Sequence, residues 1–391
     1  MVQTVDVLVV GAGIVGASCA YALMRAGVRV TVVDRGGVAS GTTGAGEGNI
    51  LVSDKEPGPE LELALRSNDL WRELAEECGG FEWEPKGGLV VAETPEVLDA
   101  LTAFAETQRR HTRAAGAGPG DPETTPPASG AVAAVPVAAG NLRDFEPHIA
   151  DGLAGGLHYP QDAQVQPMLA AARLLKASGA RLVRTAVERF LVSGDRVTGL
   201  RTGQGDLHAD AVVNAAGTWA GNFPQAPLPI RPRKGFILVT QPFAVPPVRH
   251  KVYTAAYVTN VASDAEGLET SAVIESTRAG TVLIGASRQR VGHDTAIDYP
   301  VLARLARQAI GLFPVLKDRQ VMRAYAGLRP YSPDHLPVIG PDHRLRNLFH
   351  ACGHEGAGIG LAPATAEMIT AQIAGARPAV DPAPFAPGRF A

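Results

Sequence analysis

Hydrophobic and polar positions follow a strand, helix, strand order at the start of the chain. Residues 5–10 form a mostly apolar run, residues 14–26 place apolar side chains at helical spacing, and residues 29–33 are again apolar up to Asp34. An apolar run of this kind is typical of a strand that is covered on both faces, as in a parallel sheet. The pattern therefore predicts a tight βαβ unit at the N-terminus.

A second stretch of α/β pattern lies in the middle of the chain. It predicts a helix over 167–178, strands over 180–190 and 196–202, and a buried strand from Ala211 that runs into a turn at Gly217. Other segments have a different pattern, and they predict a strand over 88–92, a helix over 95–110, several strands over 233–287, a helix over 301–312, and a strand, glycine turn and helix over 348–374. This interleaving predicts a second domain threaded through the first.

Two segments have the composition of a linker rather than of a core. Residues 114–140 consist almost entirely of Ala, Gly, Pro, Ser, Thr and Val, which predicts a flexible surface loop. The last residues of the chain are rich in proline, which predicts a loosely held tail.

Composition narrows the class of protein. The 391 residues suffice for one large domain or two closely joined ones, and 36 basic against 39 acidic residues leave a formal net charge of −3. This balance argues against a nucleic-acid partner. Three cysteines without CxxC spacing argue against a disulfide framework and a metal site, and favour a cytoplasmic setting. Residues 7–24 are uncharged but interrupted by glycines, so we expect no membrane span.

Three glycines between the first strand and the first helix indicate a dinucleotide site. Gly11 permits a tight turn, Gly13 lets the backbone approach a pyrophosphate, and Gly16 lets the helix pack closely on the strand. Asp34 ends the second strand, where a carboxylate accepts hydrogen bonds from ribose hydroxyls and disfavours a 2′-phosphate. These residues leave NAD and FAD open and argue against NADP.

The stretch that follows Asp34 is rich in glycine and hydroxyl side chains, as expected where backbone passes close to a large planar ligand. Here the chain resembles the D-amino-acid oxidase superfamily of FAD proteins, in particular glycine oxidase, sarcosine oxidase and the D-hydroxyproline or opine dehydrogenase subunits. The motifs that carry this resemblance are at residues 11–16, 40–50, 159–167, 213–219, 326–330 and 353–360.

The resemblance implies an α/β fold with a Rossmann-type FAD-binding domain and an interleaved α+β substrate domain on a mixed sheet. The implied FAD-binding domain consists of residues 1–80, 150–225 and 326–391, and the substrate domain of 81–149 and 226–325. FAD is the implied cofactor, and we expect it to be non-covalent because Cys352 is more simply a buried free thiol.

Carried over residue by residue, the resemblance also implies the cofactor site. The implied FAD-binding residues are Gly11, Gly13, Ile14, Val15, Gly16, Asp34, Arg35, Ser40, Thr42, Thr43, Gly46, Glu47, Gly48, Asn49, Ile50, Val187, Ala215, Ala216, Gly217, Trp219, Arg329, Gly353, His354, Gly356, Ala357, Gly358 and Ile359. The helix that follows Gly353 would bring its N-terminus, with free N–H groups, toward the flavin.

Arg329 matches the arginine that holds the substrate carboxylate in glycine oxidase-like relatives, and a guanidinium is the natural bidentate partner of that group. A structural ion pair is the alternative. The implied reaction oxidises the C–N bond of an amino acid, secondary amine or imino acid by hydride transfer to flavin N5, and the imine then hydrolyses. Either O₂ or an electron-accepting partner subunit would take the electrons; a flavin hydroxylase is a further alternative.

Several residues depart from the family pattern. His354, Glu355 and Glu47 are candidate catalytic groups, as a base or as a partner of the substrate ammonium. The alternative for His354 is a hydrogen-bonded turn histidine, and for Glu355 a solvated carboxylate. For Glu47 it is an ion pair with an arginine such as Arg329. Val273 stands where glycine oxidase has a substrate-binding tyrosine.

Two further groups of residues are open to more than one interpretation. Tyr253 and Tyr257 are candidate substitutes for the missing tyrosine. Several basic side chains are interpreted as a solvated strand end rather than as an anion site, namely Arg231, Arg233, Lys234 and, separately, Arg288.

Overall fold

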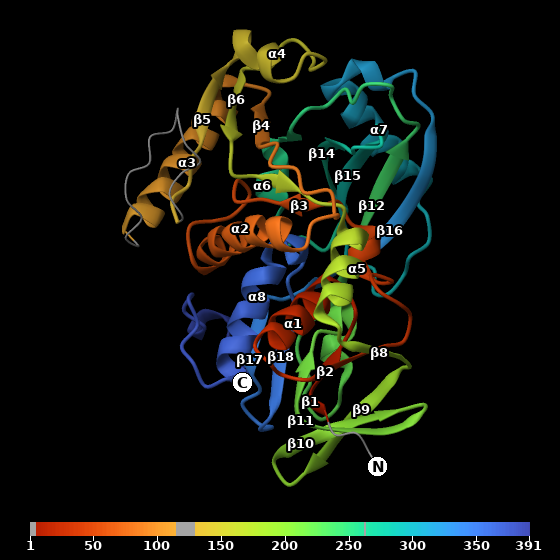
Figure 1. The fold of residues 1–391 in the computed structure, drawn as a ribbon. Coiled ribbons are helices and arrows are strands. Elements are labelled where there is room, and N and C mark those ends of the chain that lie inside the picture. Colours follow the sequence, from red (N-terminus) through yellow and green to blue (C-terminus); the bar gives the residue numbers. More distant parts are fainter. Residues whose placement is uncertain (1–4, 115–129, 262) are drawn as a thin grey trace.

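The computed structural model describes residues 5–114, 130–261 and 263–391. Within these residues, two eight-stranded sheets lie at opposite ends of the molecule, with helices around and between them (Figure 1). The first sheet has the order β17-β18-β11-β1-β2-β8, and β9 and β10 extend from β11. Its strands are β1 (Val5–Val10), β2 (Val30–Asp34), β8 (Arg181–Arg184), β9 (Val187–Ser193), β10 (Arg196–Thr202), β11 (Gly205–Asn214), β17 (Val338–Pro341) and β18 (Leu348–Cys352).

The first sheet is a parallel sheet at its centre. Strand β1 pairs in parallel with β2 and β11, and β11 pairs in parallel with β18. Helices α1 (Ile14–Arg25), α5 (Pro167–Ser178) and α8 (Gly358–Ile373) pack together over one face. Burial on both faces explains the nearly unbroken apolar sequence of β1.

The second sheet is mixed and has the order β16-β12-β15-β14-β13-β4-β6-β5. Its strands are β4 (Gly88–Ala92), β5 (Val135–Ala138), β6 (Gly155–Tyr159), β12 (Arg231–Thr240), β13 (Lys251–Thr254), β14 (Glu269–Ser276), β15 (Val282–Arg288) and β16 (Val321–Tyr331). Helix α7 (Tyr299–Leu312) packs on it, capped by the Asp298 side chain. The Rossmann-type α/β fold with an interleaved mixed-sheet unit is thereby confirmed.

Further elements lie outside the two eight-stranded sheets. They are the two-stranded pair of β3 (Asn49–Ile50) and β7 (Ala163–Gln164), and the helices α3 (Pro95–Ala114), α4 (Leu142–Phe145) and α6 (Ala255–Val261). The division of the chain at residues 81, 150, 226 and 326 stays a prediction. Strand β6 lies in the second sheet although its residues follow position 150, and β16 crosses position 326.

Helix α2 (Pro59–Glu77) was not predicted, and it holds the start of α8 in place. Pro363 has no N–H to donate to the carbonyl of Ile359, four residues earlier. Instead, Trp71 Nε1 donates to the Ile359 carbonyl at 3.1 Å, and Ser67 Oγ donates to the Gly360 carbonyl at 2.5 Å. Two side chains of α2 thus satisfy the carbonyl groups of the first turn of α8.

Two predictions about individual segments need correction. The strand expected over 180–190 is divided into β8 and β9, and the residues between them face the cavity described below. Of the loop expected over 114–140, residues 115–129 lie outside the described residues, whereas Val135–Ala138 pairs with β6 as strand β5.

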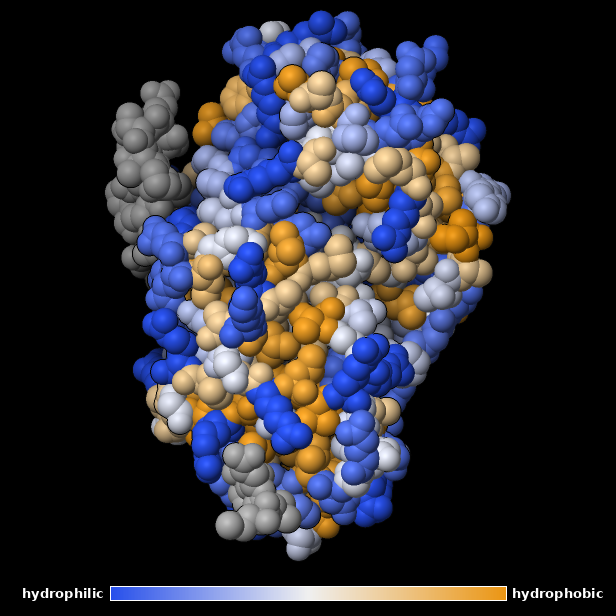
Figure 2. Space-filling view, turned by 45° about the vertical axis from the view of Figure 1, so that its right-hand side comes forward, coloured by the Kyte–Doolittle hydropathy of each residue, from blue (hydrophilic) through white to orange (hydrophobic). Residues whose placement is uncertain are grey.

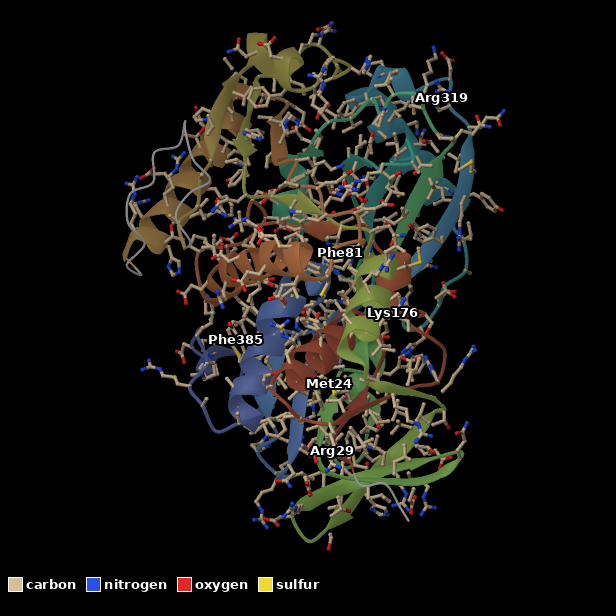
Figure 3. All side chains as sticks on the ribbon, viewed as in Figure 1. Met24, Arg29, Phe81, Lys176, Arg319 and Phe385 are labelled. Atoms are coloured by element: carbon tan, nitrogen blue, oxygen red, sulfur yellow. The ribbon has the colours of Figure 1, made fainter. Side chains whose placement is uncertain are left out.

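The C-terminal tail is anchored rather than loosely held. Phe385 is fully buried, and Arg389 forms an ion pair with Asp334 at 2.6 Å. Figure 3 shows Phe385 beside α8 and Phe81 beside α2. Phe81 packs edge-on against Trp71, with ring centroids 5.7 Å apart. The proline-rich composition of the tail therefore does not prevent it from packing on the first sheet.

The surface mixes charged and apolar side chains, and Figure 2 shows apolar ones gathered along the middle of one face. Among the described residues, no helix combines the length and the apolar character that a membrane crossing requires.

Candidate active site

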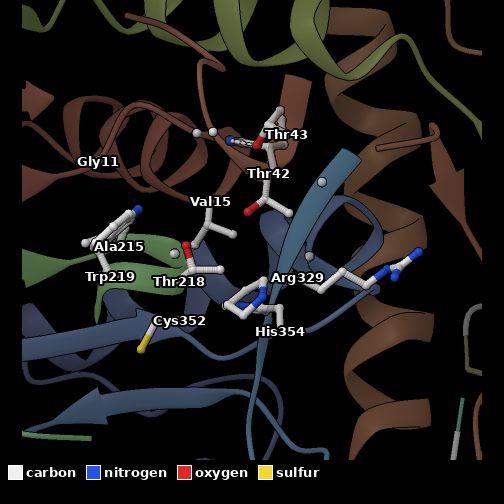
Figure 4. A pocket seen from close by; sticks show the side chains of 18 of the residues that line it. Gly11, Val15, Thr42, Thr43, Ala215, Thr218, Trp219, Arg329, Cys352 and His354 are labelled. Atoms are coloured by element: carbon white, nitrogen blue, oxygen red, sulfur yellow. Dashed lines mark hydrogen bonds between the residues drawn. The ribbon is translucent and has the colours of Figure 1, made fainter. Parts of the chain in front are cut away.

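A cavity of about 660 Å³ lies between the two sheets. Its walls come from three distant parts of the chain: residues 10–49, residues 185–223, and residues 327–359, with additions from the second sheet. In Figure 4, Trp219 and Arg329 lie at opposite ends of the group of side chains drawn. This volume is typical of a ligand site.

The glycine turn between β1 and α1 brings backbone against backbone. Gly11 has φ +108°, and a Cβ there would collide with the carbonyl oxygen of Ala215. The N-cap residue Gly13 has no capping side chain, and Thr43 Oγ1 accepts the Ile14 N–H at 3.0 Å in its place. The N-terminus of α1 therefore opens onto the cavity, as an anion site requires.

Asp34 is held by the backbone at the end of β2. Its two carboxylate oxygens accept the N–H groups of Ala12 at 2.8 Å and Gly36 at 2.7 Å. Next to it, the Arg35 guanidinium lies 4.1 Å above the Trp219 ring, and His293 stacks on Trp219 with centroids 4.2 Å apart. This end of the cavity offers a carboxylate and a stacked aromatic surface.

Arg329 reaches the cavity by crossing a glycine. Its strand, β16, pairs with β12, and its guanidinium passes over Gly235 of β12 to donate to the Ser287 carbonyl of β15 at 2.8 Å. A Cβ at position 235 would collide with the guanidinium. Burial and the nearby charge of Arg288 lower the pKa of Arg329 to about 10. Among the described residues, no carboxylate forms an ion pair with Arg329.

Glu47 pairs with a lysine rather than with Arg329. The Lys251 ammonium donates to Glu47 at 3.1 Å and to Glu275 at 2.8 Å, and all three side chains are buried. Burial raises the pKa of Glu47 although the Lys251 charge opposes the shift. Its second oxygen, Oε1, has no hydrogen-bond partner among the described residues. Glu47 lies on the cavity wall, but Oε1 is buried against Gly285 and does not open into the cavity.

Glu355 is not solvated, contrary to one of the interpretations above. It accepts from Arg233 at 2.7 Å and from His335 at 3.3 Å. Burial alone would raise its pKa, but these partners lower it to about 2. Arg233 is fully buried and Lys234 nearly so, which also corrects the interpretation of this segment as a solvated strand end.

His354 is a buried turn histidine whose Nε2 lies 2.9 Å from Thr365 Oγ1. Burial lowers its pKa to about 3, so the imidazole is neutral. Cys352 lines the cavity as a free thiol, and burial raises its pKa to about 12.

The cavity brings together most residues of the predicted set. On its wall are Gly11, Gly13, Ile14, Val15, Asp34, Arg35, Ser40, Thr42, Thr43, Gly46, Glu47, Asn49, Val187, Ala215, Ala216, Gly217, Trp219, Arg329, His354, Glu355, Gly356, Gly358 and Ile359. Five predicted residues lie behind the wall, namely Gly16, Gly48, Ile50, Gly353 and Ala357. Gly16 and Gly48 instead allow close backbone contacts, to Gly11 and Val165 respectively.

One of the two candidate tyrosines lies on the wall, and several other wall residues were not predicted. Tyr257 lines the cavity, whereas Tyr253 is buried behind it beside Ser53. Gly235, Ile237 and Ala286 also line it from the second sheet. Tyr257 was a candidate because it lies shortly before Val273, which stands where glycine oxidase has a tyrosine. The others have no local signal because their position depends on how the two sheets meet.

The βαβ turn, the Asp34 carboxylate and the open helix N-terminus define a dinucleotide-binding oxidoreductase of the Rossmann type. The family model described as FAD dependent oxidoreductase, abbreviated DAO, matches residues 6–372. The chain therefore belongs to this family, and its cofactor is FAD. The backbone cradle at Gly11 and Gly13 fits a pyrophosphate, and Asp34 fits a ribose.

Individual relatives agree over the full length. Glycine oxidase from Pseudomonas aeruginosa is 31% identical over 399 residues, which cover 97% of this chain and 98% of the relative. Hydrogen cyanide synthase subunit HcnC from the same organism is 28% identical over 447 residues, covering 100% and 97%. The crystal structure of glycine oxidase from Geobacillus kaustophilus has a TM-score of 0.83 at 27% identity and covers 98% of both chains.

Proposed function

We propose that this protein oxidises the C–N bond of an amino acid, or of a secondary amine or imino acid that carries a carboxylate. It is an FAD-dependent oxidoreductase that acts on CH–NH or CH–NH₂ groups, and its likeness to glycine oxidase supports an amino-acid substrate. The observation that carries the proposal is Arg329, a cavity-wall guanidinium with no carboxylate partner in the described part of the chain. Its partner is the substrate carboxylate.

The remaining wall residues suggest a division of roles. Glu47 contributes its charge at the cavity wall toward the substrate amine, while Lys251 holds the carboxylate in place. Glu355 stays ionised and engaged with Arg233, so it positions its neighbours and does not take up a proton. His354 is neutral and contributes hydrogen bonding rather than acid–base chemistry.

The reaction removes two electrons and the α-hydrogen from carbon and a proton from nitrogen, and water hydrolyses the resulting imine. Bound FAD supplies the acceptor for the electrons. We infer non-covalent binding, because the raised pKa of Cys352 disfavours the thiolate that a covalent link would need.

The test is anaerobic loss of flavin colour on addition of D-, L-, N-methyl and cyclic amino acids. For the class of compound that bleaches the protein, Arg329→Gln should raise the substrate KM on the order of 100-fold, or ~3 kcal/mol of binding. Arg323→Gln is the matched control, since Arg323 is an exposed arginine on the same strand. Bleaching by no amino acid, with FAD bound, would exclude the proposal.

Transfer of electrons to a partner subunit is the second candidate. The relative HcnC is named as a subunit. Val321 and Met322, on the edge strand β16, are 47% and 56% exposed. The substrate-reduced protein should then recolour slowly in air and rapidly with an artificial electron acceptor; rapid recolouring in air would instead indicate an oxidase.

A further inference from the structure

Arg288, the last residue of β15, is a buried cation without a partner. Its side chain is 3% exposed, and it forms no hydrogen bond or ion pair with any residue that the structure describes. Its guanidinium lies 4.8 Å from the centroid of the Tyr257 ring, so it stands directly behind a wall residue of the cavity and is not itself a wall residue. A buried charge of this kind is costly unless something pairs with it.

The other buried cations around the cavity are paired. Arg233 has Glu355 and Glu269, and Lys251 has Glu47 and Glu275. These four carboxylates therefore already form ion pairs, and the two cations that they neutralise are not available to bind an anionic ligand.

Apart from the exposed Arg35, the described residues around the cavity include two guanidinium groups that form no ion pair, those of Arg288 and Arg329. They are close in space, because Arg329 donates to the carbonyl of Ser287, the residue before Arg288. Tyr257 lies beside both, since it carries the Arg288 guanidinium on its ring and lines the cavity together with Arg329. One substrate carboxylate would satisfy Arg329 and leave Arg288 without a partner.

We propose that Arg288 forms a second anion subsite beside Arg329, and that the substrate is an amino or imino acid with two carboxylates. This inference rests on the proposed function, because it takes the Arg329 carboxylate as given. The second carboxylate is carried either on the substituent of the nitrogen or on the side chain of the amino acid. Arg288 pairs with it, and Tyr257 flanks it.

Pairs of compounds that differ by one carboxylate test the subsite on the FAD-loaded protein. Iminodiacetate against sarcosine places the extra group on the nitrogen substituent, and aspartate against alanine, in both chiral forms, places it on the side chain. Binding is measured anaerobically from the change in the flavin spectrum. At least one pair should show the dicarboxylate bound 10-fold or more tightly than its partner. Equal binding within both pairs would overturn the proposal.

Arg288→Gln should remove this preference, so that the dicarboxylate binds no more tightly than the monocarboxylate. Arg290→Gln should retain it, because Arg290 already faces Glu266 at 3.4 Å. Equal weakening of both compounds by Arg288→Gln would contradict a second subsite. Arg288→Lys, which keeps the charge, should preserve part of the preference if the glutamine variant folds poorly.

A ligand-free measurement separates a binding role from a structural one. Without ligand, Arg288→Gln should raise the Tm or leave it unchanged, because the variant removes an unpaired buried charge. A lower Tm would show instead that Arg288 stabilises the folded protein. The two proposals can fail separately. Succinate and butyrate are not oxidised, so a comparison of their binding tests the second subsite even if no amino acid is a substrate. Arg329→Gln tests the first carboxylate site, because its effect is measured with monocarboxylates alone.

Discussion

Glu47 and Lys251 are 204 positions apart in the chain, and their charged groups meet 3.1 Å apart in the protein interior. Glu275 completes the group, so that one cation serves two carboxylates. The arrangement joins the loop after η1 (Thr42–Ala45) to strands β13 and β14 of the second sheet. It therefore ties the loop that follows the first βαβ unit to the second sheet at the cavity.

Lys251→Met should destabilise the protein by about 3–5 kcal/mol at pH 7, because two carboxylates then remain buried without a cation. The pKa of Glu47 is already raised by burial, so the folded variant binds protons that the unfolded chain releases. Its free energy of unfolding should consequently recover as the pH falls. Urea unfolding at several pH values measures this. Lys317→Met, at an exposed position, should change stability by less than about 0.5 kcal/mol; an equally small change in Lys251→Met would contradict the expectation.

Asp162 gives a second pH dependence with a defined interval. Burial raises the pKa of this carboxyl from 3.8 to about 7, against the opposing hydrogen bonds of Ser53 and Val52. The folded state thus keeps a proton that the unfolded state loses between these values. The free energy of unfolding should fall as the pH rises through this interval, by up to ~1.4 kcal/mol per pH unit.

Asp162→Asn should flatten that slope, because the amide oxygen still accepts the Val52 N–H while the amide carries no charge. Thermal unfolding of both proteins between pH 4 and pH 8 compares them. If stability still falls with rising pH in the variant, a titratable group other than Asp162 causes the pH dependence.

Gly11→Ala should abolish FAD binding. The positive φ and the collision of the new Cβ with the Ala215 carbonyl both oppose the native turn. Gly27→Ala isolates the first effect, since Gly27 has φ +83° and open space around it. The control variant should lose about 1 kcal/mol of stability and bind FAD normally. Flavin content after purification reads out the result, and a yellow Gly11→Ala protein would refute the steric argument.

Trp71→Phe should cost about 1–3 kcal/mol in unfolding free energy, because the Ile359 carbonyl loses its donor and Pro363 offers none. FAD should also dissociate more readily, since Ile359 lies on the cavity wall at the start of α8. Trp83→Phe is the control, because its indole N–H bonds to no described residue. If both variants retained wild-type FAD affinity, α2 would have no part in positioning α8.

The sequence allowed prediction where the chemistry is local. The turn at Gly11, the carboxylate at Asp34 and the ends of α5 and β10 follow from glycine, charge and apolar spacing within a few residues. Helix α2 had comparable signals, with Pro59 at its first position and leucines at helical spacing, and it was overlooked.

Ion-pair partners were not predictable in the same way. The pairing of Glu47 with Lys251 and of Glu355 with Arg233 depends on strands brought together from distant positions. Nothing next to Arg233 in the chain indicates that it is fully buried. The same holds for Arg288, whose lack of a partner appears only when all neighbouring carboxylates are placed.

The parallel pairing of β1 with β11 and of β11 with β18 has a consequence for biosynthesis. A ribosome that adds about 5–20 residues per second needs roughly 20 to 70 s to proceed from the Gly11 turn to the residues that begin α8. Strand β1 gains its neighbours β2 and β11 earlier in that time, whereas β11 lacks its parallel neighbour β18 until residues 348–352 are made. Because the start of α8 lines the cavity, the complete FAD site can form only when translation of these residues is finished.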